Sequence, residues 1–233
     1  MRIDKFLSDA GFGTRKEVRI LVKKGAVSVN GKAVTDAGAH IDCDWDAITV
    51  YGEPVVYQRF RYYMMNKPSG VVSATEDGRE RTVLDLLPPA LRKGLFPVGR
   101  LDKDTTGLLL LTDDGALAHC LLSPKKHVDK TYLVTYDGKL PSDVENLFAN
   151  GLRVDETFRA LPAKLVRLSE CEAYVTIREG KYHQVKRMFA AVGCRVTALR
   201  RISMGTLALD ETLREGDFRE LYAQELTLLR SNS

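Results

Sequence analysis

The stretch from Gly99 to Gly107 constrains this chain most, because a polar loop there runs directly into four leucines. The loop contains Gly99-Arg100-Leu101-Asp102-Lys103-Asp104-Thr105-Thr106-Gly107, and Leu108 to Leu111 follow at once. Such an aliphatic run is typical of a buried strand. A buried strand would hold the end of the loop rigidly, which is how a scaffold positions a reactive side chain.

The polar residues around the four leucines also have a purely structural explanation, since Asp, Thr and Gly are common in turns. Aspartate and threonine bond to neighbouring backbone groups, and glycine tolerates unusual dihedral angles. We assign this structural role to the three residues after the strand, Asp113, Asp114 and Gly115. For Asp104, Thr105 and Thr106 the structural and the functional interpretations are equally good.

The N-terminal residues predict a helix with a basic flank, followed by a hairpin. Thr14 and Glu17 have the spacing of a capping box, so a helix is expected over about 14–24, after a shorter one near Ile3 to Leu7. Asn30-Gly31 then predicts a tight turn. Residues 2–32 hold eight Lys or Arg against three acidic residues, so this segment is basic although the chain's net charge is only +4. The basic residues on the flank of the helix are Arg15, Lys16, Arg19 and Lys23.

The composition shift near Pro54 divides the chain into two domains. We predict a small N-terminal α/β domain over 1–55, a linker over 56–60 and a larger domain over 61–233. In the larger domain, strand-like and helical stretches mix without a regular βαβ repeat. The predicted class is therefore α+β, with a mixed, largely antiparallel sheet flanked by helices. The expected strands include 132–136, 173–177 and 196–199, and the expected helices are near 115–122, 142–150 and 183–192.

Composition argues against several other classes of protein. No apolar run approaches the roughly 18 residues of a membrane span, and Asp4 and Asp9 interrupt any secretory signal, so we expect a cytoplasmic protein. The four cysteines lie far apart and the four histidines lack metal-ligand spacing. Both observations argue against a disulfide framework and against a metal site.

Three stretches of the first domain carry a resemblance to a known family: Arg2 to Leu7, Thr14 to Val18 and Gly25 to Gly31. They resemble the small RNA-binding domain named after ribosomal protein S-four. The resemblance implies that the second helix, with its basic flank, and the hairpin bind RNA backbone. For an isolated helix, a solvated charged face would be the better interpretation.

Four stretches of the second domain occur in the order of one enzyme family: Asn66 to Gly70, Gly99 to Gly107, Lys130 to Tyr132 and Glu179 to Phe189. They resemble the pseudouridine synthases, specifically the bacterial ribosomal small-subunit type, and with the first domain the resemblance covers essentially the whole chain. It implies a cofactor-free isomerisation of uridine to pseudouridine in structured ribosomal RNA, with position 516 of 16S RNA as the expected target. It also implies that Asp102 is the essential residue.

The reaction requires a glycosidic bond to break and uracil to rejoin ribose through carbon 5, for which a carboxylate can supply covalent catalysis. Asp102 can act at carbon 6 of the ring or at carbon 1 of ribose, and the sequence favours neither. Burial alone favours the neutral form of a carboxyl group, so a cation must lie close. On a helix starting near His183, Lys186 borders the apolar face and is the expected partner in a buried ion pair. Arg187 points outward and is expected to bind RNA phosphate.

Two further residues are expected to handle the target nucleotide. In the family, the tyrosine that matches Tyr132 stacks on the base, and an aromatic face suits a ring that must turn once detached. Arg100 is expected to bind the flipped phosphate or to fill the space that the uridine leaves. The ordinary alternatives are a half-buried strand tyrosine and a surface arginine.

A second basic region covers residues 178–201, where seven Lys or Arg accompany one acidic residue, Glu179. Together with the N-terminal basic flank, it predicts a two-site grip on structured RNA by a protein that we expect to be a monomer. Three alternatives stay open: the same reaction on 23S RNA, a catalytically silent assembly factor, and a metal-dependent nuclease using Asp102, Asp104 and Asp113. The strand that separates Asp113 from the other two carboxylates counts against the nuclease.

Overall fold

The computed structural model describes residues 1–233 except 44, 56–59, 124–125 and 232–233. The chain forms two compact units, Met1–Phe60 and Arg61–Ser233, here called the N-terminal and the C-terminal unit. Four of the five residues of the predicted linker lie outside the described residues. No helix in the described part of the chain has the length and apolar character needed to cross a bilayer.

The N-terminal unit packs two helices against a small antiparallel sheet. The helices are α1 (Ile3–Asp9) and α2 (Arg15–Lys23), and Thr14 and Glu17 form the predicted capping box. The sheet has the order β2-β1-β3-β4, and the turn residues Asn30 and Gly31 have φ angles of 53° and 77°. The predicted hairpin is therefore confirmed. Its strands are β1 (Val27–Val29) and β2 (Lys32–Ala33), and the other two are β3 (Ile48–Val50) and β4 (Glu53–Pro54).

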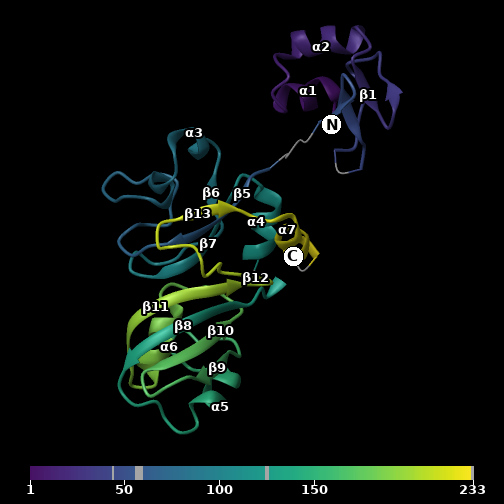
Figure 1. Ribbon diagram of the computed structural model, residues 1–233. Coiled ribbons are helices and arrows are strands. Elements are labelled where there is room, and N and C mark those ends of the chain that lie inside the picture. The colour runs from purple at the N-terminus through teal and green to yellow at the C-terminus, as the bar shows by residue number, and fades with distance from the viewer. Residues whose placement is uncertain (44, 56–59, 124–125, 232–233) are drawn as a thin grey trace. The chain divides into compact units, whose positions relative to one another are not determined.

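The C-terminal unit is built on one mixed sheet with the order β13-β5-β7-β11-β8-β10-β9 (Figure 1). Only β7 and β11 run parallel among the pairs described, and the short strands β12 and β6 add to β11 and β7. The predicted α+β class is confirmed. The strands are β5 (Tyr62–Lys67), β6 (Phe96–Pro97), β7 (Thr106–Thr112), β8 (Lys130–Asp137), β9 (Lys164–Arg167), β10 (Glu172–Ile177), β11 (Arg195–Met204), β12 (Leu207–Ala208) and β13 (Phe218–Glu220).

Helices cover this sheet and complete its core. Helix α6 packs on β11, and α5 packs on β9 (Figure 1). The expected helix over 183–192 begins one residue later, because His183 has a left-handed φ of 49° and precedes the first helical turn. The helices are η1 (Val83–Leu86, a 3-10 helix), α3 (Pro89–Arg92), α4 (Gly115–Leu122), α5 (Val144–Ala149), α6 (Gln184–Ala191) and α7 (Ala223–Ser231).

Strand β7 lies between β5 and β11, which explains its run of leucines. Leu108 to Leu111 are all buried, because both faces of the strand are covered. Gly107 at its start has a φ of 98°, and a Cβ added there would lie 2.3 Å from the carbonyl oxygen of Arg201. Only glycine permits this close approach of β7 to β11. The loop that carries Asp102 is thereby anchored to the centre of the sheet.

Candidate active site

A buried lysine binds the backbone of the loop that precedes β7. The side chain of Lys67, at the end of β5, is fully buried. Its Nζ lies 2.8 to 3.3 Å from the backbone carbonyls of Pro68, Asp102, Lys103 and Thr105. Burial lowers the pKa of Lys67 to about 8, against the opposing charges of Asp104 and Asp102. Lys67 lies in the Asn66 to Gly70 stretch, and no pattern in the sequence predicts this anchoring role.

Asp102, in this loop, forms an ion pair with Lys186 of α6. Lys186 Nζ is 3.4 Å from Oδ2 of Asp102 and 2.6 Å from Oδ1 of Asp104. The ion pair is half-buried rather than buried, since the Lys186 and Asp102 side chains are 22% and 26% exposed. Burial acts to lower the pKa of Lys186, but the bond to Asp104 and the charges of both aspartates outweigh it and raise that pKa. The same bond lowers the pKa of Asp104.

His183 contacts Asp102 from the opposite carboxylate oxygen. Its Nε2 is 3.6 Å from Oδ1 of Asp102, and its ring stacks on Tyr182 with centroids 3.8 Å apart. The left-handed conformation of His183, just before α6, turns its ring toward the loop. Sequence reasoning missed this residue, although it stands in the quoted motif three positions before Lys186. Asp102 therefore contacts a basic side chain through each of its two carboxylate oxygens.

Tyr132 lines the hollow into which Asp102 points. It belongs to β8, pairs in register with Val175 of β10 and Arg201 of β11, and is 7% exposed. The hollow, about 400 Å³ with the space at its mouth, is lined by Asp102 and Tyr132. The other residues that line it come from the loop, from strands β10 and β11, and from the segment around the start of α6. They are Arg100, Leu101, Thr105, Ile177, Gly180, Lys181, His183, Gln184, Val185 and Leu199. The hollow thus combines a carboxylate, an aromatic face and a partly apolar wall.

The two arginines predicted to bind phosphate differ in their surroundings. Arg100 is exposed and lines the hollow, so it is free to reach a nucleotide there. The guanidinium of Arg187 is instead held by Asp155 and lies 4.9 Å from the centre of the Phe158 ring. The outward orientation predicted for Arg187 overlooked Asp155, which approaches from a segment remote in sequence. Part of the donor set of Arg187 is thus engaged by Asp155.

The basic flank of α2 belongs to the N-terminal unit. Arg15, Lys16, Arg19 and Lys23 are all exposed. Arg19 is partly committed, because its Nη2 lies 3.4 Å from Oδ2 of Asp4, a fully buried residue that also binds Arg2. The hydrogen bond from Arg2 lowers the pKa of Asp4, against the cost of burial. The other members of this flank, Arg15, Lys16 and Lys23, form no ion pair with any residue that the structure describes.

The carboxylates proposed for a nuclease are engaged with cations. Asp102 and Asp104 share Lys186, and Asp113 accepts from Arg61 Nε at 2.9 Å. Within the described ranges, no three His, Cys, Asp or Glu side chains gather in a geometry that suits a metal ion. The arrangement favours acid–base or covalent chemistry by a carboxylate over a two-carboxylate metal site.

Comparison with known proteins agrees with this arrangement. Residues 61–191 match the family model of RNA pseudouridylate synthases, and residues 1–42 match that of the S4 domain. A Bacillus subtilis protein named uncharacterized RNA pseudouridine synthase YtzG is 51% identical, with 98% of each chain covered. The ribosomal small subunit pseudouridine synthase A of Vibrio cholerae is 44% identical, with 97% of this chain and 98% of the relative covered.

A solved structure extends the likeness to the fold. A crystal structure of a pseudouridylate synthase superposes with a TM-score of 0.70 at 38% identity, and covers 98% of this chain and 99% of its own. The loop of Asp102 and the strand of Tyr132 both lie within the residues that match the synthase family model. On sequence, fold and the carboxylate that faces a partly apolar hollow, this chain belongs to the family of RNA pseudouridine synthases that carry an N-terminal S4 domain.

Proposed function

We propose that this enzyme converts one uridine of 16S ribosomal RNA to pseudouridine, at position 516, with Asp102 as its catalytic carboxylate. The observation that carries the proposal is the position of Asp102 between Lys186 and His183, at a hollow whose wall is Tyr132. The relative from Vibrio cholerae, which is named for the small ribosomal subunit, supports the choice of 16S RNA. RNA of that subunit, free or in an assembly intermediate, is the proposed partner of a monomeric, cytoplasmic enzyme.

The chemistry needs no redox step, because the product is an isomer of the substrate. The bond between ribose carbon 1 and nitrogen 1 breaks, and a bond between ribose carbon 1 and carbon 5 forms. Carbon 5 loses one proton and nitrogen 1 gains one, so the atoms balance. Asp102 acts as a nucleophile at carbon 6 of the base or at carbon 1 of ribose, with the ammonium of Lys186 3.4 Å from its carboxylate.

The surrounding residues hold the reacting parts. Tyr132 offers an aromatic face to the uracil, which must turn between the two bonding steps. A target uridine must leave its stack in the RNA, at a cost of a few kcal/mol. Arg100, exposed at the rim of the hollow, can bind the phosphate of that nucleotide and so offset part of this cost. The exposed basic flank of α2 supplies further contacts to RNA backbone.

The test is site-resolved mapping of pseudouridine in 16S and 23S transcripts, and in small-subunit assembly intermediates, after incubation with the enzyme and a chelator. One new site at position 516, absent with Asp102→Asn, is the expected result. A site in 23S RNA alone would replace the proposed target but keep the reaction. Turnover by Asp102→Asn near the wild-type rate would remove Asp102 from the mechanism, and no modification of any RNA would favour the assembly factor.

A further inference from the structure

A second hollow shares part of its wall with the first. The two share Arg100, Tyr132, Gly180 and Lys181 as lining residues. The second hollow holds about 930 Å³, including the solvent at its mouth. Its basic lining residues are Arg100, His127, Lys130, Arg178, Lys181 and Arg201, and we call it the cationic pocket.

Two of these cations are buried, which is unusual for unpaired charges. Arg201 of β11 is 2% exposed and Lys130 of β8 is 8% exposed. Arg201 Nε donates to the carbonyl of Leu108 at 2.8 Å, and its Nη2 is a buried atom without a hydrogen-bond partner. Lys130 Nζ donates to the carbonyl of Val128 at 3.1 Å. Among the residues that the structure describes, no carboxylate lies within ion-pair distance of either side chain.

One carboxylate, Glu179, lines the pocket among its five Lys and Arg residues, and its Oε1 accepts from the backbone of Leu161 and from Nε2 of Gln184, each at 2.8 Å. Asp129 pairs with Arg178 at 2.9 Å. The pocket therefore keeps an excess of positive charge. Burial lowers the pKa of Lys130, and the neighbouring charge of Arg201 lowers it further, against the opposing charge of Asp129.

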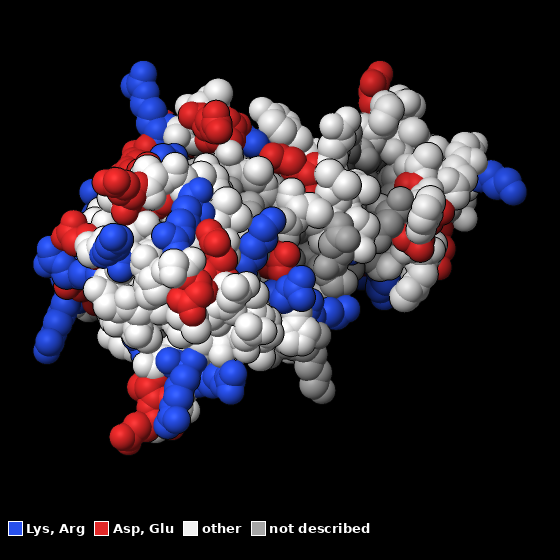
Figure 2. Space-filling model, turned by 90° about the horizontal axis from the view of Figure 1, so that it is seen from below, with Lys and Arg blue, Asp and Glu red and all other residues white. Residues whose placement is uncertain are grey.

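Two buried like charges cost folding free energy, and an anion that binds between them would offset that cost. On the face shown in Figure 2, Lys and Arg are interspersed with Asp and Glu. Guanidinium and ammonium groups are the usual ligands of phosphate oxygens, whereas an uncharged base would leave both charges unpaired.

We propose that the cationic pocket binds a backbone phosphate of the RNA strand, within one nucleotide of the target uridine. The proposal rests on the proposed function, because Tyr132 lines both hollows and the base is placed on its face. A phosphate held by Lys130 and Arg201 would keep the ribose in place while the detached uracil turns. The pocket would then act on the strand directly at the reacting nucleotide, apart from any contact made by the N-terminal unit.

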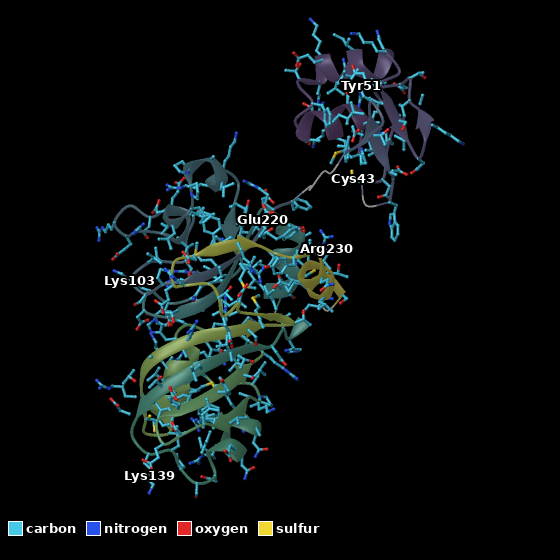
Figure 3. All side chains as sticks on the ribbon, in the orientation of Figure 1. Cys43, Tyr51, Lys103, Lys139, Glu220 and Arg230 are labelled. Carbon is cyan, nitrogen blue, oxygen red and sulfur yellow. The ribbon has the colours of Figure 1, made fainter. Side chains whose placement is uncertain are left out.

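The first experiment measures binding without turnover. Uridine 3′,5′-bisphosphate, uridine and inorganic phosphate are titrated into the full-length protein, and the Kd of each is followed by NMR. We expect Lys130→Met to raise the Kd of the bisphosphate about tenfold or more, since a hydrogen bond to a charged group is lost, and to leave the Kd of uridine unchanged. The control is Lys139→Met, an exposed lysine labelled in Figure 3, which should change neither value.

Two outcomes would overturn the proposal: an unchanged Kd of the bisphosphate in Lys130→Met, or inorganic phosphate binding as tightly as the bisphosphate, which would indicate a site for free anions. Thermal unfolding separates binding from structure. Because Lys130 is an unpaired buried cation, Lys130→Met should unfold at the same or a higher temperature. If Lys130→Met unfolds at a lower temperature, a second variant decides. Arg201→Lys keeps the charge but loses the planar donors, and it must weaken bisphosphate binding while the protein stays folded. Unchanged binding would overturn the proposal.

The same probe distinguishes this proposal from the proposed function. Asp102→Asn should bind the bisphosphate as the wild type does, because Asp102 does not line the cationic pocket. If that variant kept its turnover, the catalytic assignment would fail while the phosphate site stood. If the wild type modified its RNA but bound the bisphosphate no better than uridine, the phosphate site would fail while the function stood.

Discussion

The ammonium of Lys67 donates a hydrogen bond of 3.1 Å to the backbone carbonyl of Asp102, so a buried charge supports the candidate nucleophile from beneath. The same ammonium binds the carbonyls of Lys103 and Thr105. The loop is thus fixed through its backbone, which leaves the side chain of Asp102 free to face the hollow. Ser73 adds a second anchor, since its hydroxyl exchanges 3.0 Å bonds with the backbone of Leu101.

Lys67→Met should destabilise the protein and lower kcat while leaving KM for RNA nearly unchanged. The variant leaves buried carbonyls unpaired, at about 1–3 kcal/mol, and releases the loop that holds Asp102. The matched control is Lys103→Met in the same loop, which Figure 3 shows as a labelled side chain. Lys103 is half exposed and pairs with Glu80, so its loss should cost under about 1 kcal/mol. Urea unfolding and steady-state kinetics measure both effects; equal effects of the two variants would contradict the anchoring role.

The lowered pKa of Lys67 predicts how stability depends on pH. Its pKa is about 8 in the folded protein, against 10.5 for an ordinary lysine. Between these values the unfolded chain binds the proton and the folded protein has released it, so the Lys67 contribution to unfolding free energy rises with pH. Measured from pH 7.5 to 10.5, the stability of the wild type should therefore increase relative to Lys67→Met, in which all other groups titrate alike. A falling difference would contradict the lowered pKa.

Lys186 and Asp104 should contribute unequally to catalysis. Lys186→Met removes the cation beside Asp102, and we expect kcat to fall on the order of a hundredfold, about 3 kcal/mol of barrier. Asp104→Asn should lower kcat less than about tenfold, because Lys186 keeps its contact with Asp102. Single-turnover rates on the mapped RNA site measure both. A larger loss in Asp104→Asn than in Lys186→Met would assign the controlling charge to Asp104 instead.

The basic flank of α2 should determine part of the salt dependence of RNA binding. Replacing Arg15, Lys16 and Lys23 by Gln removes three exposed charges and leaves Arg19 with its partner Asp4. If each charge contacts one phosphate, the slope of log K against log salt should become shallower by about 2. Filter binding at several salt concentrations gives the slope, and circular dichroism checks the fold. An unchanged slope would remove this flank from the RNA interface.

Local patterns were enough to predict much of the fold. The capping box of Thr14 and Glu17, the Asn30-Gly31 turn and the buried strand after Gly107 all depend on neighbours in sequence, and each is present. The mixing of strand-like and helical stretches without a regular βαβ repeat was sufficient for the class of the sheet. The order of its strands was beyond local reasoning, because the parallel pairing of Thr106 with Arg200 joins segments that no local pattern relates.

The candidate site was predictable in part, for the same reason. Helical geometry placed Lys186 beside the apolar face of α6, and the structure brings it to Asp102. The contact of Asp155 with Arg187, the four carbonyls around Lys67 and the left-handed backbone of His183 depend on tertiary packing. Periodicity reports which face of a helix is buried, but it does not report which charges from distant loops meet the other face.

The parallel pairing of β7 with β11 also bears on when this enzyme becomes active during its own synthesis. Asp102, Tyr132 and Lys186 all precede β11, yet Gly107 reaches its close approach only against the backbone of Arg201. A nascent chain that ends after α6 holds every proposed catalytic side chain but lacks the central strand that orders their loop. Such a fragment, truncated after residue 192, is expected to be inactive and largely unfolded, as circular dichroism and RNA mapping would detect. Contacts this distant in sequence form late, so we expect the emerging chain to modify no RNA until nearly all of it has been made.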